Sequence, residues 1–150
     1  MDEALTSDRI AGFLGWAQGD LVGMFSDPER REEIGAALGR IAAPDLACLM
    51  IGGEPGPTSE YYGVGGVAHA WEDWLEPWES YDLRFEEMIP GDEAIVVLVR
   101  VRARTKQDDV EVEHAPAAVL FFRDDMLTRL EFHLDRRLAF AAAGLPQPDG

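Results

Sequence analysis

The stretch from Glu93 to Leu134 constrains the fold most, because it reads as three consecutive β-strands joined by short polar turns. Apolar residues recur at every second position in the runs Glu93–Arg104, Val110–Phe122 and Leu127–Leu134. Such alternation is typical of strands in a sheet. The short connections favour pairing between neighbours in the chain. We therefore predict an antiparallel meander of three strands.

Charged residues indicate the register of this meander. A turn at residues 105–109 places Arg104 opposite Glu111 and Arg102 opposite Glu113. Opposite charges that face each other across two strands stabilise the pair. Residues 123–126 contain two adjacent aspartates, which tolerate a positive φ and therefore favour a second tight turn.

An unbroken register through the second turn would divide the side chains into two faces. We expect the following residues to share the face that lines the interior: Leu98, Arg100, Arg102, Glu113, Ala115, Ala117, Val119, Phe121, Thr128, Leu130, Phe132 and Leu134. The opposite face would carry Ile95, Val97, Val99, Val101, His114, Pro116, Ala118, Leu120, Phe122, Arg129, Glu131, His133 and Asp135. Both faces are apolar in their centres, so both should be covered.

Helices are predicted before and after the meander from capping residues and apolar spacing of 3.6 residues. The helices should begin at Thr6 or Ser7, at Asp20 for a short piece, at Asp27-Pro28, after Gly65-Gly66 and at Asp135. The second long helix should end at Pro44 and the last at Gly144. One stripe of the helix after Gly66 would hold Val67, Trp71, Trp74, Leu75 and Trp78, with Pro77 marking its end.

Two further strands are expected outside the meander. Leu46–Ile51 is a short apolar run between Pro44 and Gly52, and it fits a buried strand. Residues 81–85 alternate as another strand, and the doubled acid Glu86-Glu87 indicates a β-bulge. The Gly/Pro-rich segment 54–61 is expected to be a loop. Helices combined with a bent antiparallel or mixed sheet make an α+β fold in one domain, residues 1–150.

Composition limits the class of protein. The net charge of −16 over 150 residues argues against a nucleic-acid partner and against binding to anionic membranes. The acidic start and the lack of a long apolar run predict a cytoplasmic protein that does not enter a membrane. Cys48 is the only cysteine and is expected to be a small buried hydrophobe. We expect no cofactor and no metal site.

The order of several short motifs resembles the SnoaL-like branch of the nuclear transport factor 2-like superfamily, which includes ketosteroid isomerases and polyketide cyclases. The motifs are Gln18-Gly19-Asp20-Leu21, Tyr62-Gly63, residues 74–78, residues 91–97, residues 122–125, Asp135-Arg136-Arg137 and residues 142–145. The resemblance covers most of the chain. It implies a cone of helices and a curved sheet around an apolar pocket, and it implies a homodimer. The superfamily contains enzymes and pure interaction modules, so the fold does not fix the function.

Two positions depart from the enzymes of this superfamily. Counting back from Asp135, the catalytic aspartate of the polyketide cyclases would fall on Phe132, and a phenyl ring cannot transfer a proton. The tyrosine and asparagine that hold water in the related epoxide hydrolase would fall on Cys48 and Met50. Both departures weaken an enzymatic interpretation.

The remaining catalytic candidates are few. Glu113 beside Arg100 could anchor a polar group of a ligand or act as a base, and the alternative is a solvent-exposed ion pair. His114 and Asp135 could form an acid–base pair, although an aspartate at this position is more often a helix cap. The predicted ligand-binding residues are Leu98, Arg100, Ala115, Ala117, Leu130 and Phe132, with Trp74 and Tyr62 at the edge of the pocket.

Three functions remain open at this point. The first is binding of a small apolar or aromatic metabolite, and the second is an isomerase, cyclase or dehydratase that uses a non-standard acid–base residue. The third is an interaction module whose cone is filled by its own side chains. A homodimer is expected through the face that carries Val97, Val99, Val101, Pro116, Ala118 and Leu120, because an exposed patch of that size needs a partner. The main alternative cover is a helix from the same chain.

Overall fold

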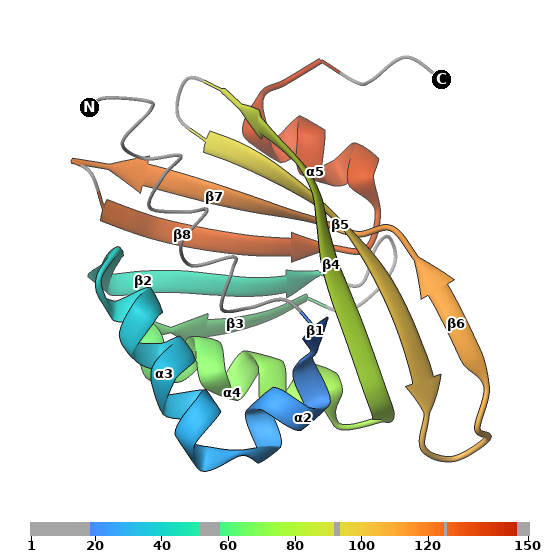
Figure 1. Cartoon of the computed structure of the whole chain (residues 1–150). Helices are drawn as coiled ribbons and strands as arrows, with labels where there is room; N and C mark the ends of the chain where they lie inside the picture. The colour runs from blue at the N-terminus through green and yellow to red at the C-terminus, as the bar shows by residue number, and fades with distance from the viewer. Residues whose placement is uncertain (1–18, 52–57, 92–93, 125, 147–150) are drawn as a thin grey trace.

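The computed structural model describes residues 19–51, 58–91, 94–124 and 126–146 (Figure 1). One strongly bent, open sheet of eight strands has the order β1-β4-β5-β7-β8-β2-β3, and β6 pairs with β5. The strands are β1 (Gly19–Asp20), β2 (Ala42–Ile51), β3 (Thr58–Tyr62), β4 (Trp78–Pro90), β5 (Ala94–Thr105), β6 (Glu111–His114), β7 (Ala117–Arg123) and β8 (Met126–His133). The helices are α2 (Leu21–Ser26), α3 (Pro28–Gly39), α4 (Gly63–Leu75) and α5 (Arg136–Ala143).

The predicted antiparallel meander of three strands is confirmed. Its first strand is β5, its middle strand is divided into β6 and β7, and its third strand is β8. Arg102 lies opposite Glu113 and Arg104 opposite Glu111, as the charges predicted. The middle strand is interrupted at Pro116, which has no N–H to donate to the ladder. The register is the same on both sides of this break, because the Pro116 carbonyl still accepts from the Val99 N–H at 3.2 Å.

A β-bulge at Thr128 overturns the predicted faces. Phe122 pairs with Leu127, as an unbroken register requires, but the next residue, Phe121, pairs with Arg129, so Thr128 has no partner on β7. The Thr128 hydroxyl donates to the Phe121 carbonyl at 3.3 Å. One extra residue turns every following side chain to the other face. Leu130 and Phe132 were predicted to share a face with Leu98 and Ala117. They lie instead on the opposite face.

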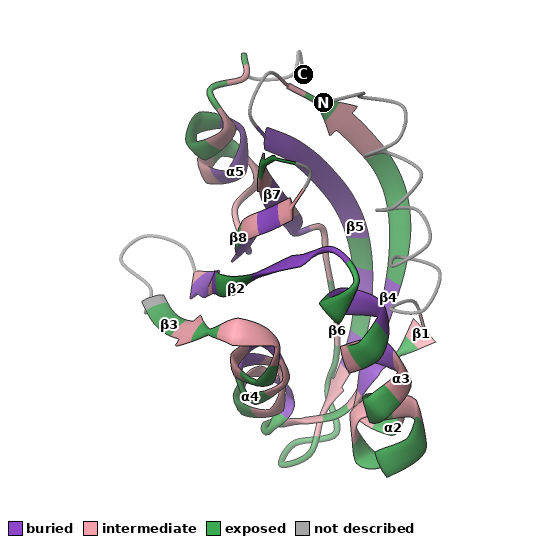
Figure 2. Ribbon diagram, turned by 90° about the vertical axis from the view of Figure 1, so that its left-hand side faces the viewer, coloured by how far each residue is buried: buried purple, intermediate pink, exposed green. Residues whose placement is uncertain are grey.

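The sheet has two faces with different cover (Figure 2). The cavity face packs against α2, α3 and α4 and is formed by Val97, Val99, Leu120, Leu130 and Phe132, with their neighbours of the same core cluster. The α5 face packs against Ala139 and Phe140 of α5 and is formed by Ala94, Val96, Leu98, Ala117 and Val119.

The patch predicted to need a second copy of the chain is covered within one chain. Val97, Val99, Val101 and Leu120 are all buried in the core under the helices. The argument for a dimer through this patch is therefore wrong. Dimerisation by another surface is not tested by the structure of one chain and stays a prediction.

Capping residues place the helices as the sequence indicated. The side chains of Asp20, Asp27 and Asp135 each accept a hydrogen bond from the backbone N–H two residues later. Gly144 ends α5 in the left-handed conformation at φ 70°. The helix predicted from Thr6 or Ser7 lies outside the described residues.

Three local predictions are wrong. Pro44 does not end a helix, because α3 ends at Gly39 and Pro44 lies in an irregular part of β2. Residues 58–61 form strand β3 rather than a loop. Trp78 begins β4 and does not belong to the α4 stripe. In addition, β2 runs parallel to β8, a pairing that the apolar run at 46–51 did not indicate.

The doubled acid before Pro90 is a bulge, as predicted. Phe85 pairs with Val99 and Glu87 with Leu98, so Glu86 is the extra residue of β4. It leaves the ladder and reaches Arg100 and Arg136. In the described ranges of the chain, no helix is both long and apolar enough to cross a bilayer.

Candidate functional site

An apolar cavity of about 80 Å3 lies between the cavity face and the helices. Thirteen of the described residues line it, and all thirteen are apolar. They come from α2, α3, α4 and from five strands: Leu21, Phe25, Ile34, Met50, Val67, Trp71, Leu83, Val97, Val99, Ala118, Leu120, Leu130 and Phe132. The described part of its wall disfavours charged groups, because none of these thirteen residues would replace the hydration of a charge.

Phe132 is the aromatic centre of this wall. It is 3% exposed, lies opposite Ala118 on β7 and opposite Met50 on β2, and contacts two tryptophans of α4 edge to face. Its ring centroid lies 5.0 Å from that of Trp71 and 5.5 Å from that of Trp74. Phe132 thus separates the cavity from Trp74, which does not line it.

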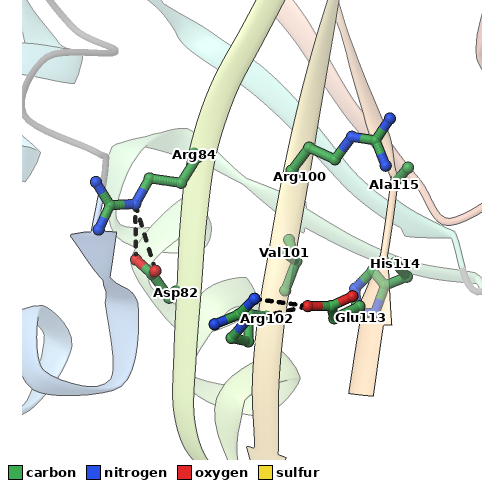
Figure 3. A pocket seen from close by; sticks show the side chains of 8 residues that line it. All are labelled: Asp82, Arg84, Arg100, Val101, Arg102, Glu113, His114 and Ala115. Carbon is green, nitrogen blue, oxygen red and sulfur yellow. Dashed lines mark hydrogen bonds and ion pairs between the residues drawn. The ribbon is translucent and has the colours of Figure 1, made fainter. Parts of the chain in front are cut away.

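A second hollow, the arginine groove, lies on the other side of the sheet, beyond the part that α5 covers. It has a volume of about 660 Å3 and is lined by Asp82, Arg84, Arg100, Val101, Arg102, Glu113, His114 and Ala115 (Figure 3). Strands β4, β5 and β6 supply these residues. The groove is polar and open, in contrast to the cavity.

The predicted ligand-binding residues are divided among different places. Leu130 and Phe132 line the cavity, whereas Arg100 and Ala115 line the arginine groove. Leu98 and Ala117 line neither, because they are buried under α5. Tyr62 is 64% exposed and its hydroxyl lies 3.4 Å from Glu60. The Thr128 bulge is the physical reason for the division, since it places Leu130 and Phe132 of β8 on the face opposite to that of Leu98 and Arg100.

Tyr81 forms a buried hydrogen-bond chain that sequence reasoning missed. The Trp74 indole N–H donates to the Tyr81 oxygen at 3.0 Å, and the Tyr81 hydroxyl lies 3.2 Å from His114 Nε2. Burial raises the pKa of Tyr81 and lowers the pKa of His114. A neutral imidazole can accept a hydrogen bond from the Tyr81 hydroxyl at Nε2. The Trp74 N–H, the Tyr81 hydroxyl and His114 Nε2 then all have partners. Only the alternation of Tyr81 with Leu83 was visible in the sequence, and it predicted a core residue.

A second buried polar group lies on β8 and was also missed. His133 Nε2 lies 2.7 Å from Glu131, and the Arg129 guanidinium donates to the other carboxylate oxygen at 2.5 Å. Burial by itself would raise the pKa of Glu131, but the hydrogen bonds from His133 and Arg129 outweigh it and hold that pKa below its ordinary value. The prediction that Arg129, Glu131 and His133 share one face is confirmed, but they lie with Ala117, Val119 and Phe121 and not with Val97 and Val99.

The acid–base candidates are engaged elsewhere. Glu113 forms an exposed ion pair with Arg102 at 2.8 Å rather than with Arg100, which binds Glu86. Asp135 caps α5 and binds Arg137, and hydrogen bonds from Arg137 lower its pKa. His114 therefore meets Tyr81, not Asp135.

Cys48 is buried and no metal cluster is present in the described part of the chain. Burial raises the pKa of the Cys48 thiol to about 12, so the thiolate is not formed near neutral pH. Among the residues that the structure describes, no group of three or more His, Cys, Asp or Glu side chains could hold a metal ion.

Solved structures show which fold this is. A candidate SnoaL-like polyketide cyclase from Jannaschia sp. CCS1 has a TM-score of 0.58 at 11% identity, covering 83% of this chain and 85% of that chain. A ketosteroid isomerase-like protein from Catenulispora acidiphila, in complex with trimethylamine, has a TM-score of 0.52 at 16% identity, covering 76% and 87%. A nuclear transport factor 2-like protein from Burkholderia xenovorans has a TM-score of 0.53 at 19% identity, covering 81% and 91%.

The chain therefore has the nuclear transport factor 2-like fold, as the sequence motifs indicated. No family model matches the sequence, and no protein of curated function resembles it in sequence. At these identities the likeness defines the fold and leaves the ligand and the reaction open.

Proposed function

We propose that the protein binds a compact apolar molecule, or the compact apolar end of a larger one, in the cavity lined by Phe132, Trp71 and Met50. The observation that supports this most directly is a cavity of about 80 Å3 whose thirteen described wall residues are all apolar. Ligand sites are typically concave and mostly apolar, and an apolar cavity without polar partners stays dry.

The size of the cavity limits the ligand. A volume of about 80 Å3 corresponds to roughly three water-sized groups, whereas benzene occupies a cavity of about 150 Å3. A ligand of a few non-hydrogen atoms fits without movement of the wall. Small, branched and uncharged molecules are therefore the suitable probes for this chain.

The two other functions are less well supported. An enzyme of the isomerase, cyclase or dehydratase type needs an acid or base next to the substrate, and none of the described wall residues can transfer a proton. An interaction module with a filled cone would leave no cavity. The retained space between Trp71, Phe25 and Leu130 therefore favours binding.

Xenon binding tests this proposal, because xenon enters dry apolar cavities without any polar contact. We expect saturable 129Xe chemical-shift changes for the wild type and their loss in Ala118→Ile, which adds three carbon atoms to the cavity wall. The matched control is Ala115→Ile, the same change in the arginine groove, which should bind xenon as the wild type does. Equal xenon binding by both variants, with both folded, would contradict the proposal.

The partner and location predictions go with this function. A small apolar metabolite is the proposed partner and a cytoplasmic location is proposed from composition, whereas a homodimer is proposed only because the resemblance to this superfamily implies one. Light scattering distinguishes a monomer of 16.6 kDa from a dimer.

A further inference from the structure

A further hollow, the outer pocket, lies beside the apolar cavity where α2 meets the end of α4. It has a volume of about 240 Å3 and is open to solvent. The described residues that line it are Val22, Phe25, Ser26, Glu72, Leu75, Glu76 and Lys106. They come from α2, from α4 and its C-cap, and from the turn after β5, and α2 and α4 contact each other in this region (Figure 1).

Phe25 is the only described residue that lines both the cavity and the outer pocket. Its place in α2 explains this. Leu21 and Phe25 are four residues apart, so they lie on one stripe of the helix, and both line the cavity. Val22 and Ser26 form the next stripe, and both line the outer pocket. Phe25 therefore stands at the boundary between the two hollows.

Helix α4 is divided in the same way. Val67 and Trp71, again four residues apart, line the cavity. Glu72, the next residue along the helix, lines the outer pocket. The boundary between the hollows thus follows the contact between α2 and α4, and the partly buried ring of Phe25 fills it from the α2 side.

The outer pocket offers polar groups that the cavity lacks. Glu72 forms an ion pair with Arg31, so its charge is already balanced. Glu76 and Lys106 are exposed, and neither forms an ion pair with another described residue. One free carboxylate and one free ammonium leave the lining without an excess of either charge. Such a lining suits a polar end group that is itself uncharged.

We infer that the cavity and the outer pocket form one binding site for an uncharged amphiphile with a short alkyl chain. The alkyl end lies in the cavity, the hydroxyl or amide end lies in the outer pocket, and Phe25 determines which chain lengths are accepted. This inference rests on the proposed function, because the alkyl end occupies the same cavity.

Passage of a chain requires only that the Phe25 ring turns aside. Phe25 is partly exposed and lies in a helix of six residues, Leu21–Ser26, with Gly23 at its centre. A helix this short gains little stability from its own hydrogen bonds, and an interior glycine lowers it further. Side chains that reach the surface change rotamer within nanoseconds. Phe25 can therefore admit a chain without any movement of the sheet.

The test is an NMR titration of the full chain with ethanol, butanol and hexanol as primary alcohols. We expect affinity to rise by about fourfold for each added methylene, the value for burial of one CH2 group. This rise should continue beyond butanol, and hexanol should shift the amides of Glu76 and Lys106, which ethanol leaves unchanged. An affinity that levels off at butanol would overturn the inference, and xenon binding would still support the apolar cavity. Loss of both xenon and butanol binding would contradict the cavity as well.

Variants connect the chain-length dependence to Phe25. Phe25→Ala should raise the ratio of hexanol affinity to butanol affinity and speed the exchange of xenon, because the ring no longer separates the hollows. Val22→Ala is the matched control, since Val22 lies in the same helix but lines only the outer pocket. It should keep the ratio and the exchange rate of the wild type.

The same ratio and exchange rate in Phe25→Ala as in the wild type, or an equal change in Val22→Ala, would overturn the role of Phe25. The amide spectrum of each variant shows whether it is folded. If Phe25→Ala does not fold, Phe25→Leu takes its place, because it keeps an apolar side chain and removes the ring.

Discussion

The two faces of the sheet are built from the same alternating strands but have opposite character. On β5 the odd-numbered residues Val97, Val99 and Val101 lie in the core beneath three helices. Of the even-numbered residues, Leu98 lies under α5, whereas Arg100 and Arg102 reach beyond α5 to solvent. The alternation on β5 places valines on one face and arginines on the other. The cover by helices then decides which part of each face is buried and which part is open to solvent.

The largest effect should come from the cavity face, at Phe132. Phe132→Ala should lower the free energy of unfolding by roughly 3 to 5 kcal/mol, because it removes a buried ring between Trp71 and Trp74. The enlarged cavity should also admit benzene, which the wild type excludes. Denaturant unfolding and a benzene titration by NMR measure the two effects.

Phe140→Ala is the control on the α5 face, because Phe140 is equally buried at 3% but lines no described cavity. It should lose comparable stability and gain no benzene binding. If Phe132→Ala instead left stability unchanged, Phe132 would face solvent and the register beyond the Thr128 bulge would be wrong.

A somewhat smaller effect is expected at Glu131, a buried charge on the α5 face. Glu131→Gln should cost about 1.5 to 3 kcal/mol at pH 7, because Arg129 and His133 contact different carboxylate oxygens and one of these becomes an amide nitrogen that cannot accept. Since the folded state lowers the pKa of Glu131, its contribution is complete above the ordinary pKa of a glutamate and is lost as the pH falls through the lowered value. Urea unfolding from pH 7 to pH 3 should show the two proteins converging in acid.

Tyr81→Phe tests the hydrogen-bond chain at the end of the cavity face. Losing the hydroxyl leaves the Trp74 N–H and His114 Nε2 without a partner, at a cost of about 1 to 2 kcal/mol. Tyr61→Phe is the matched control, because its hydroxyl donates to Asp73 at 2.7 Å on the exposed surface. A larger loss in Tyr61→Phe than in Tyr81→Phe would show that the buried chain adds nothing to stability.

The smallest effect on stability is expected for the exposed ion pairs that lie beyond α5. Arg102 binds Glu111 and Glu113, but its side chain is 66% exposed. Exposed pairs of this kind contribute little and are screened by salt. Arg102→Gln should leave the urea midpoint unchanged within error at physiological salt. A clear loss of stability would show that these pairs act as a coupled network.

Sequence patterns predicted the elements that local chemistry determines. The charges of Arg102 and Glu113 predicted the register of β5 with β6 correctly. The adjacent acidic residues Glu86-Glu87 predicted the β-bulge, and Asp135 predicted the N-cap of α5. Nothing local marks the bulge at Thr128, because threonine is favourable in a regular strand as well. The predicted pocket lining was wrong from that residue onward, and so was the prediction that Phe132 and Arg100 share a face.

Contacts between distant segments could not be predicted in the same way. Tyr81 and His114 are 33 positions apart, and their hydrogen bond exists only because β4 and β6 both pair with β5. The parallel pairing of β2 with β8 brings Met50 beside Phe132 and likewise depends on the whole sheet. Alternation placed these residues on strands without showing which of them meet.

The bulge at Thr128 also has a meaning for how such a chain can diverge. Residue 128 is unpaired on β7, so its deletion would restore an even ladder at the cost of one backbone position. Phe132 would still pair with Ala118 on the cavity face, and Glu131 would still pair with Val119 on the α5 face. The strand can thus lose this one position without turning its hydrocarbon wall away from the interior.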